Sequence, residues 1–220
     1  MKYCNLQFYV DKLKNDEKFS LARYGDGEMY CMWGKKGQNS NGCRYSPELR
    51  ASLLESMQYP NDTSFIYGMQ RVLPMDRVRF EHEYPNTIFY DTEIFSEAVA
   101  NGELYPLIEQ LRKMKVVIIG NSTLKPVADK ILNCGFVEIP PCNSYDCKDM
   151  IKEHIKDRDT VYSFSAGMGA NAIIGEMHRR VDCWLIDIGH IWDPFVGLMS
   201  RCDLEGKTKE DIEKNLYDNR

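Results

Sequence analysis

Apolar runs and amphipathic segments alternate regularly in the second half of the chain. Residues 115–120 (KVVIIG) form a continuous apolar, β-branched run, which is typical of a parallel strand that is covered on both faces. Strands and helices then alternate as far as residue 188, which predicts an α/β fold: a Rossmann-like, doubly wound, mostly parallel sheet with helices on both faces. The predicted elements that follow are a helix at 126–134 capped by Gly135, a strand at 136–139, a helix at 146–156, a strand at 160–164, a helix at 171–180 and a strand at 183–188.

The first half of the chain carries the same two kinds of segment at less regular spacing. Apolar residues at helical spacing predict a helix over 5–18, and Ser46-Pro47 predicts the capped start of another. We expect one domain over residues 1–200 and a helical tail over 201–220. The other predicted elements are strands at 64–68 and 87–90, helices at 91–100 and 104–111 and a charged amphipathic helix at 203–217, whereas 69–86 show no clear period.

A pair of carboxylates flanked by glycines follows the first predicted strand. Gly25 and Gly27 are expected to permit positive φ and close ligand approach, which would project Asp26 and Glu28 from the carboxyl end of that strand. One or two carboxylates hold Mg²⁺ or Mn²⁺ while water and a ligand diphosphate fill the other positions. A capping or solvated pair without a ligand is the alternative interpretation.

Composition and charge limit the class of partner. The chain has 220 residues, of which 43% are hydrophobic, and 28 Lys and Arg against 33 Asp and Glu give a net charge of −5. This balance argues against a large nucleic-acid-binding surface and leaves room for a local basic pocket for one phosphorylated ligand. The first twenty residues carry charges throughout, so we expect no signal peptide, no transmembrane segment and a cytoplasmic location.

The eight cysteines are expected to be thiols. The chain is larger than a small secreted disulfide scaffold and shows no export signal. The spacing from Cys142 to Cys147 is not that of a zinc or redox site, and only four histidines are available to complete one.

Small, polar and acidic residues follow most of the predicted strands. Ligands bind outside the carboxyl ends of strands in an open parallel sheet, so these residues are the candidate site. The segment SAGMGA opens a predicted helix whose N-terminus suits a phosphate, although glycines in such turns often serve packing alone. The candidates are Asp26, Glu28, Asn121, Asn143, Ser165, Gly167, Gly169, Asp187 and His190.

Two basic side chains near the candidate site have alternative roles. His190 is expected either to contact a phosphate or leaving group, or to act as a base, or to serve only as a structural histidine bonded to Asp193. Arg23 either reaches a phosphate or forms a salt bridge that holds the loop. Tyr45 and its aromatic neighbours Tyr30 and Trp33 either stack on a sugar or base or belong to the core.

Five segments, in this order, resemble the GT-D-type glycosyltransferases of bacterial surface-glycan and adhesin glycosylation: FSLARYGDGEM, VVIIGN, VEIPPCNSY, SFSAGMGANAI and LIDIGHIWD. The resemblance covers residues 17–195 and is loosest over 35–110. It implies a Rossmann-like fold and a DxE metal motif at Asp26 and Glu28. It also places the glycine-rich turn (165–169) and the DIGH segment (187–190) against the donor.

The resemblance implies transfer of glucose or another hexose from a UDP-sugar to a glycan or glycoprotein acceptor, with Mn²⁺ or Mg²⁺ as the cofactor. The expected roles are metal binding by Asp26 and Glu28, catalysis by these two with Asp187 and His190, and donor binding by Arg23, Gly25, Asn121, Asn143, Ser165, Gly167 and Gly169. Two other functions stay open: an S-adenosylmethionine-dependent methyltransferase, and a non-catalytic nucleotide-sugar-binding subunit of a glycosylation complex. Self-association also stays open.

Overall fold

The computed structural model describes residues 1–60, 64–70, 72–199 and 204–218. Its centre is a seven-stranded sheet in the order β3-β2-β1-β7-β6-β4-β5, in which every pair of neighbouring strands is parallel. This confirms the predicted α/β fold. The strands are β1 (Ser20–Tyr24), β2 (Phe65–Met69), β3 (Phe89–Asp91), β4 (Lys115–Gly120), β5 (Gly135–Glu138), β6 (Thr160–Ser165) and β7 (Trp184–Asp187).

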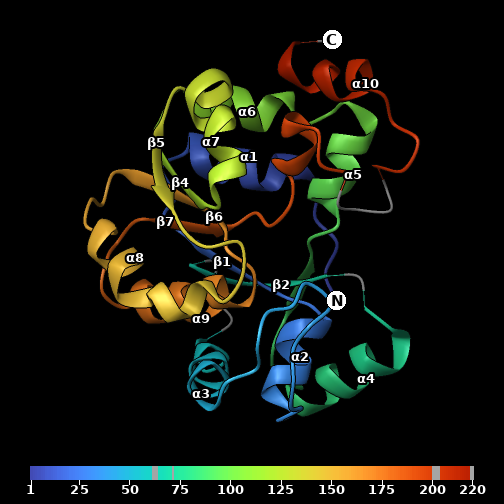
Figure 1. Ribbon diagram of the computed structural model, residues 1–220, viewed down its shortest axis with the longest axis vertical. Helices are drawn as coiled ribbons and strands as arrows, with labels where there is room; N and C mark the ends of the chain where they lie inside the picture. The colour runs from blue at the N-terminus through green and yellow to red at the C-terminus, as the bar shows by residue number, and fades with distance from the viewer. Residues whose placement is uncertain (61–63, 71, 200–203, 219–220) are drawn as a thin grey trace.

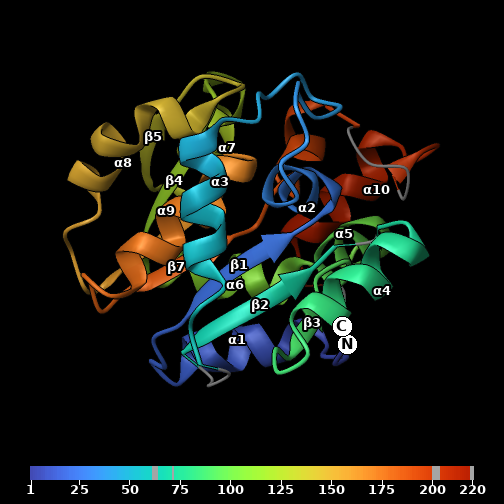
Figure 2. The same ribbon diagram turned by 90° about the horizontal axis from the view of Figure 1, so that it is seen from below.

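Helices cover both faces of the sheet and form two separate cores (Figure 1). Alternate residues of one strand point to opposite faces, so Tyr24 of β1 belongs to one core and Leu21 to the other. The helices of the first face, seen in front in Figure 2, are α2 (Asp26–Met32), α3 (Pro47–Ser56), α4 (Pro74–Glu83), α8 (Lys148–His154) and α9 (Met168–His178). Those of the second are α1 (Leu6–Lys14), α5 (Ile94–Asn101), α6 (Tyr105–Arg112), α7 (Lys125–Val127) and α10 (Lys209–Glu213).

Local signals account for some of these boundaries and fail at others. The Ser46 hydroxyl caps α3 by accepting from Leu49 N, and Pro47 occupies the first helical position, as predicted. The predicted cap at Gly135 is wrong, because Asn133 adopts the left-handed conformation (φ 50°) and Gly135 already belongs to β5. Helix α4 was not predicted, since only Phe80 of its residues is buried and the apolar period is therefore weak.

The C-terminal segment packs on the body of the protein. Ile212 of α10 is buried in the second core, and the Asn215 side chain accepts from Leu104 N and donates to Val99 O. These bonds tie the end of α5 and the start of α6 to the tail. The expected division at residue 200 stays a prediction, because residues 200–203 lie outside the described residues.

Within the described ranges, no helix combines the length and the apolar character that crossing a bilayer requires.

Candidate functional site

A pocket of about 320 Å³ lies at the carboxyl ends of the strands; we call it the strand-end pocket. Segments that follow β1, β2, β4, β5, β6 and β7 all contribute to its walls. Its lining includes Arg23, Asp26, Gly27, Glu28, Asn39, Gln70, Asn121, Pro141, Ser165, Gly167, Met168, Asp187, Gly189, His190 and Asp193. Most of the predicted site residues therefore line one cavity, as expected if ligands bind at the carboxyl ends of parallel strands.

The pocket lies where the chain leaves two adjacent strands in opposite directions. Strands β1 and β7 pair in parallel, Ser20 with Leu185 and Leu21 with Ile186. After β1 the chain enters α2 on the first face, whereas after β7 Ile188 and Trp192 enter the core of the second face. Such a divergence opens a crevice at the strand ends, which is the usual ligand position in doubly wound folds.

The two carboxylates lie in the first turn of a helix rather than in a glycine loop. Gly25 is the N-cap of α2 with φ −119°, so the expected positive φ is wrong, and Gly27 is helical. Buried Glu28 accepts from Gly25 N at 2.9 Å, and exposed Asp26 accepts from Gly27 N at 2.9 Å. Glu28 thus caps the N-terminus of α2 with one carboxylate oxygen, and Asp26 makes only a local bond to the next amide. Both side chains nevertheless line the pocket.

Close packing, not backbone freedom, explains the glycine between the carboxylates. A Cβ at Gly27 would lie 3.3 Å from both Asn39 Nδ2 and Met168 Sδ. The glycine thus lets α2 approach the loop over the pocket and the start of α9.

Glu28 is a buried carboxyl group whose ionised form is disfavoured. The pKa of Glu28 is raised to about 7, mainly by burial and to a smaller extent by the nearby Asp187 carboxylate, while the Gly25 N–H and Arg23 oppose the shift. Burial also raises the pKa of Asp187, against the lowering effect of Arg23. A site with two such carboxyl groups favours a cation, because added positive charge would stabilise both ionised forms.

Arg23 is the basic group of this site and is almost fully buried. Its Nε lies 3.4 Å from Asp187 Oδ2, and within the described residues this nitrogen has no hydrogen-bond partner. The guanidinium occupies the space over Gly189 (φ 59°), where an added Cβ would lie 1.6 Å from Arg23 Nη2. Gly189 is therefore required both for its conformation and for room. The salt-bridge interpretation of Arg23 is observed, and the side chain also lines the pocket.

Asn171 of α9, which the sequence did not single out, aligns β1 beneath the pocket. It accepts from Arg23 N at 2.8 Å and donates to Arg23 O at 2.5 Å, and it is fully buried. A polar residue within the otherwise apolar start of α9 was the available signal.

One part of the glycine-rich turn lines the pocket, and another part packs against a neighbouring element. Gly167 (φ 55°) is the N-cap of α9 and has open space beside it, and Ser165 Oγ donates to Gly189 O at 2.7 Å. Gly169 lies outside the strand-end pocket, because it packs on η3 (Ser144–Cys147): an added Cβ would lie 2.4 Å from Ser144 Oγ. Asn143 also lies outside and lines a neighbouring cavity with Gly169.

His190 lines the pocket but has a structural partner. Its Nδ1 lies 2.8 Å from Asp193 Oδ2, which is the bond that the structural interpretation predicted. With Nδ1 held, Nε2 is the ring nitrogen left for a ligand.

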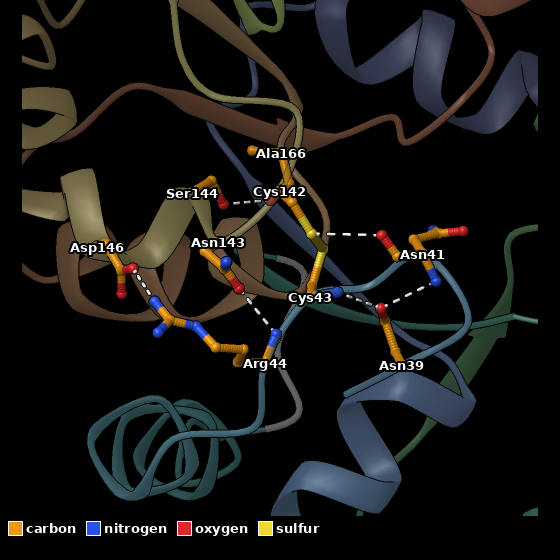
Figure 3. The surroundings of a disulfide bond; sticks show 9 residues. All are labelled: Asn39, Asn41, Cys43, Arg44, Cys142, Asn143, Ser144, Asp146 and Ala166. Carbon is orange, nitrogen blue, oxygen red and sulfur yellow. Dashed lines mark hydrogen bonds and ion pairs between the residues drawn. A yellow bond between two sulfur atoms is a disulfide. The ribbon is translucent and has the colours of Figure 1, made fainter. Parts of the chain in front are cut away.

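A disulfide joins two loops beside the pocket, which corrects the expectation that all cysteines are thiols. Cys43 and Cys142 are bonded, with their Cα atoms 5.2 Å apart (Figure 3). Arg44 N also donates to Asn143 Oδ1 at 2.7 Å, and Asn39 Oδ1 accepts from Cys43 N. The bonded cysteines are 99 residues apart in sequence, so local spacing could not reveal the pair.

The disulfide is expected to stabilise the fold. Linking residues so far apart restricts the unfolded chain, and losing such a bond typically costs about 2–4 kcal/mol. Cys43→Ser should therefore lower the free energy of unfolding by about this amount in urea titration, and dithiothreitol should do the same to the parent protein. Cys147→Ser, which removes a free thiol, is the matched control. Equal midpoints for the parent with and without reductant would contradict the expectation.

The residues present fit a divalent cation that is shared with a ligand. No group of three or more His, Cys, Asp and Glu within the described part of the chain forms a complete metal site. Asp26 and Glu28 each use one oxygen in a backbone contact and have a second oxygen for a ligand. Mg²⁺ commonly takes one or two carboxylates, with phosphates and water completing its shell.

Solved structures that share this fold include proteins with the domain of unknown function 1792. One structure of that domain matches with a TM-score of 0.68 and 17% identity, over 89% of this chain and 80% of that chain. A glycosyltransferase with the domain from Streptococcus sanguinis matches with a TM-score of 0.67 and 18% identity, over 89% and 83%.

A third structure, described as showing that this domain has a distinct glycosyltransferase fold, matches with a TM-score of 0.64 and 16% identity, over 89% and 80%. This chain therefore has the fold that the resemblance implied. No family model and no curated protein matches the sequence.

Proposed function

We propose that the protein is a glycosyltransferase that moves a sugar, glucose or another hexose, from a UDP-sugar to a glycan or glycoprotein acceptor. The observation that carries the proposal is the joint presence of Glu28, Arg23 and the open Gly167 turn in one strand-end pocket of a fold shared with solved glycosyltransferases. A nucleoside diphosphate needs positive charge and N–H donors, and a bridging cation needs carboxylates. The pocket supplies both.

Asp26 and Glu28 would hold Mn²⁺ or Mg²⁺ in this proposal. The cation would act as a Lewis acid that stabilises the charge developing on the departing diphosphate. The Glu28 carboxylate is held in place by its bond to the Gly25 amide, whereas the exposed Asp26 carboxylate is accessible to a ligand.

Three other groups would serve the donor and the proton transfer. The N-terminus of α9, which begins beside Gly167, would add a fixed dipole that favours a bound anion. Arg23 would complement phosphate charge from the base of the pocket. Asp187 is the candidate base that takes the proton from the hydroxyl group of the acceptor sugar. Burial raises the pKa of Asp187 and so makes it a stronger base than an exposed aspartate.

Ligand-dependent melting tests this function. UDP with Mn²⁺ is expected to raise the melting temperature, since a ligand that binds only the folded state stabilises it, and Asp26→Asn should remove most of the shift. Asp182→Asn is the matched control, because exposed Asp182 precedes β7 at the end of the strand remote from the pocket. An unchanged shift in Asp26→Asn would contradict the metal role.

The same assay separates the alternative functions. A shift with S-adenosylmethionine and none with UDP and Mn²⁺ would favour a methyltransferase. A shift with UDP and Mn²⁺ but no hydrolysis or transfer of a UDP-sugar would favour the non-catalytic subunit. No observation in the pocket specifically favours either alternative.

A further inference from the structure

A larger cavity of about 510 Å³ adjoins the strand-end pocket; we call it the second pocket. The segment from Cys43 to Leu49, which leads into α3, forms one wall, and residues 143–148 with the start of α9 form the others. The residues to which the proposed function assigns the donor, the metal and the proton transfer (Arg23, Asp26, Glu28, Gly167 and Asp187) do not line it. The second pocket is therefore available to a different ligand.

The two pockets are adjacent. Cys43, Ala166 and Met168 line both of them. The Cys43–Cys142 disulfide and the Arg44 N–H bond to Asn143 fix the loop at their boundary (Figure 3). A molecule in the second pocket would thus lie beside whatever occupies the strand-end pocket, at a distance set by a cross-linked wall.

The charges of the second pocket balance. Arg44 Nη2 pairs with Asp146 Oδ2 at 2.8 Å, which leaves Glu48 and Lys148 as one acid and one base. The strand-end pocket is different, because its carboxylates outnumber its cations and would hold the divalent cation that a diphosphate requires. A phosphorylated or polyanionic occupant would find no excess positive charge in the second pocket, so its chemistry favours an uncharged ligand.

Aromatic and hydrogen-bonding groups line the same cavity. Tyr45 is half-buried, and Tyr145 is held by a 2.6 Å bond between its hydroxyl and Ser52 Oγ, with Lys148 Nζ 4.5 Å from its ring centroid. Exposed Glu48 presents a carboxylate, which accepts hydrogen bonds from hydroxyl groups. An aromatic ring beside charged hydrogen-bonding groups suits a molecule with apolar C–H faces and many hydroxyls, which is a saccharide.

We propose that the second pocket binds the acceptor, an uncharged saccharide, with Tyr45 against a sugar face and Glu48 on its hydroxyls. This proposal deepens the proposed function and rests on it, because only a glycosyltransferase has an acceptor. Sugar binding itself does not require turnover. The proposal also gives Tyr45 a role in ligand binding in addition to its packing against the core.

Saturation-transfer NMR tests the proposal without turnover, with the methyl glycosides of glucose, galactose and N-acetylglucosamine as probes. At least one glycoside is expected to receive saturation from the parent protein in the presence of UDP and Mn²⁺. Tyr45→Ala and Glu48→Ala should each weaken its binding by about fivefold, the effect of losing one contact or hydrogen bond of about 1 kcal/mol. Tyr217→Ala is the matched control, since Tyr217 is exposed and remote from the pocket residues.

The outcomes distinguish the two proposals. Weaker binding in both variants, with melting temperatures equal to the parent's, supports the saccharide site. No saturation of any glycoside, or equal binding in parent and variants, overturns it. Exposed Glu48 keeps the test decisive if Tyr45→Ala lowers the melting temperature. Hydrolysis of UDP-glucose by the parent in the same samples tests the proposed function separately.

Discussion

Glu28→Gln is expected to lower metal-dependent sugar transfer and UDP-sugar hydrolysis by about a hundredfold or more, in the range seen when one electrostatic stabiliser is removed from an active site. Glutamine keeps the shape of the side chain and an oxygen for the Gly25 N–H, but it has no charge for a cation. Rates with Mn²⁺ measure the effect. Unchanged rates would rule out the proposed metal role.

The same variant should change how stability depends on pH. Burial raises the pKa of Glu28 from 4.5 to about 7 in the folded state, so the unfolded state loses its proton first. The ionisation of Glu28 therefore destabilises the fold as pH rises from 4.5 through about 7, whereas glutamine does not ionise.

Relative to the parent, Glu28→Gln is thus expected to gain roughly 3 kcal/mol of unfolding free energy between about pH 4 and pH 8, which corresponds to a pKa difference of roughly 2.5. Urea titrations of both proteins without metal at several pH values measure this gain. The comparison with the parent cancels the other carboxylates. A constant difference across pH would contradict the buried state of Glu28. Added Mn²⁺ should favour the ionised parent and reduce the gain.

Arg23→Met is expected to destabilise the protein by about 3–5 kcal/mol, because it leaves buried Asp187 without its partner. Methionine retains much of the apolar volume of the arginine stem. Lost affinity for UDP should accompany the lost stability, since Arg23 lines the strand-end pocket. Urea denaturation measures the first effect and melting shifts with UDP and Mn²⁺ the second.

A double variant separates the ion pair from simple packing. Arg23→Met with Asp187→Asn removes both charges, so most of the stability should return, while UDP affinity should stay low. If the double variant were as unstable as Arg23→Met alone, the cost would lie in packing over Gly189 rather than in the unpaired carboxylate.

Much of the architecture was predictable because it depends on local pattern. The apolar run of β4 and the alternation that follows it determine buried strands and covering helices, and Ser46-Pro47 determines the start of α3. Parallel strands place their carboxyl ends at one edge, so Glu28 and Asp187, more than 150 residues apart, could be expected in one pocket.

Other features of the site depend on contacts that no local pattern records. The sequence suggested a flexible glycine turn around Asp26, but tertiary packing makes Gly25 a helix cap and requires Gly27 for room. Asn171 was overlooked because its partner is the backbone of a distant strand, at Arg23. Gly169 resembles a phosphate-binding glycine in sequence, yet it packs on η3.

The sequence by itself determined most of the strands and helices, the parallel sheet and most of the polar residues at its carboxyl edge, because the elements follow from periodicity within a short window and the edge follows from the parallel arrangement. Only the tertiary structure decided the Arg23–Asp187 pair, the Cys43–Cys142 disulfide and the division into two pockets. These features join residues that are distant in the chain, and their energies come from burial and close contact. Both arise only when the two helix layers close over the sheet.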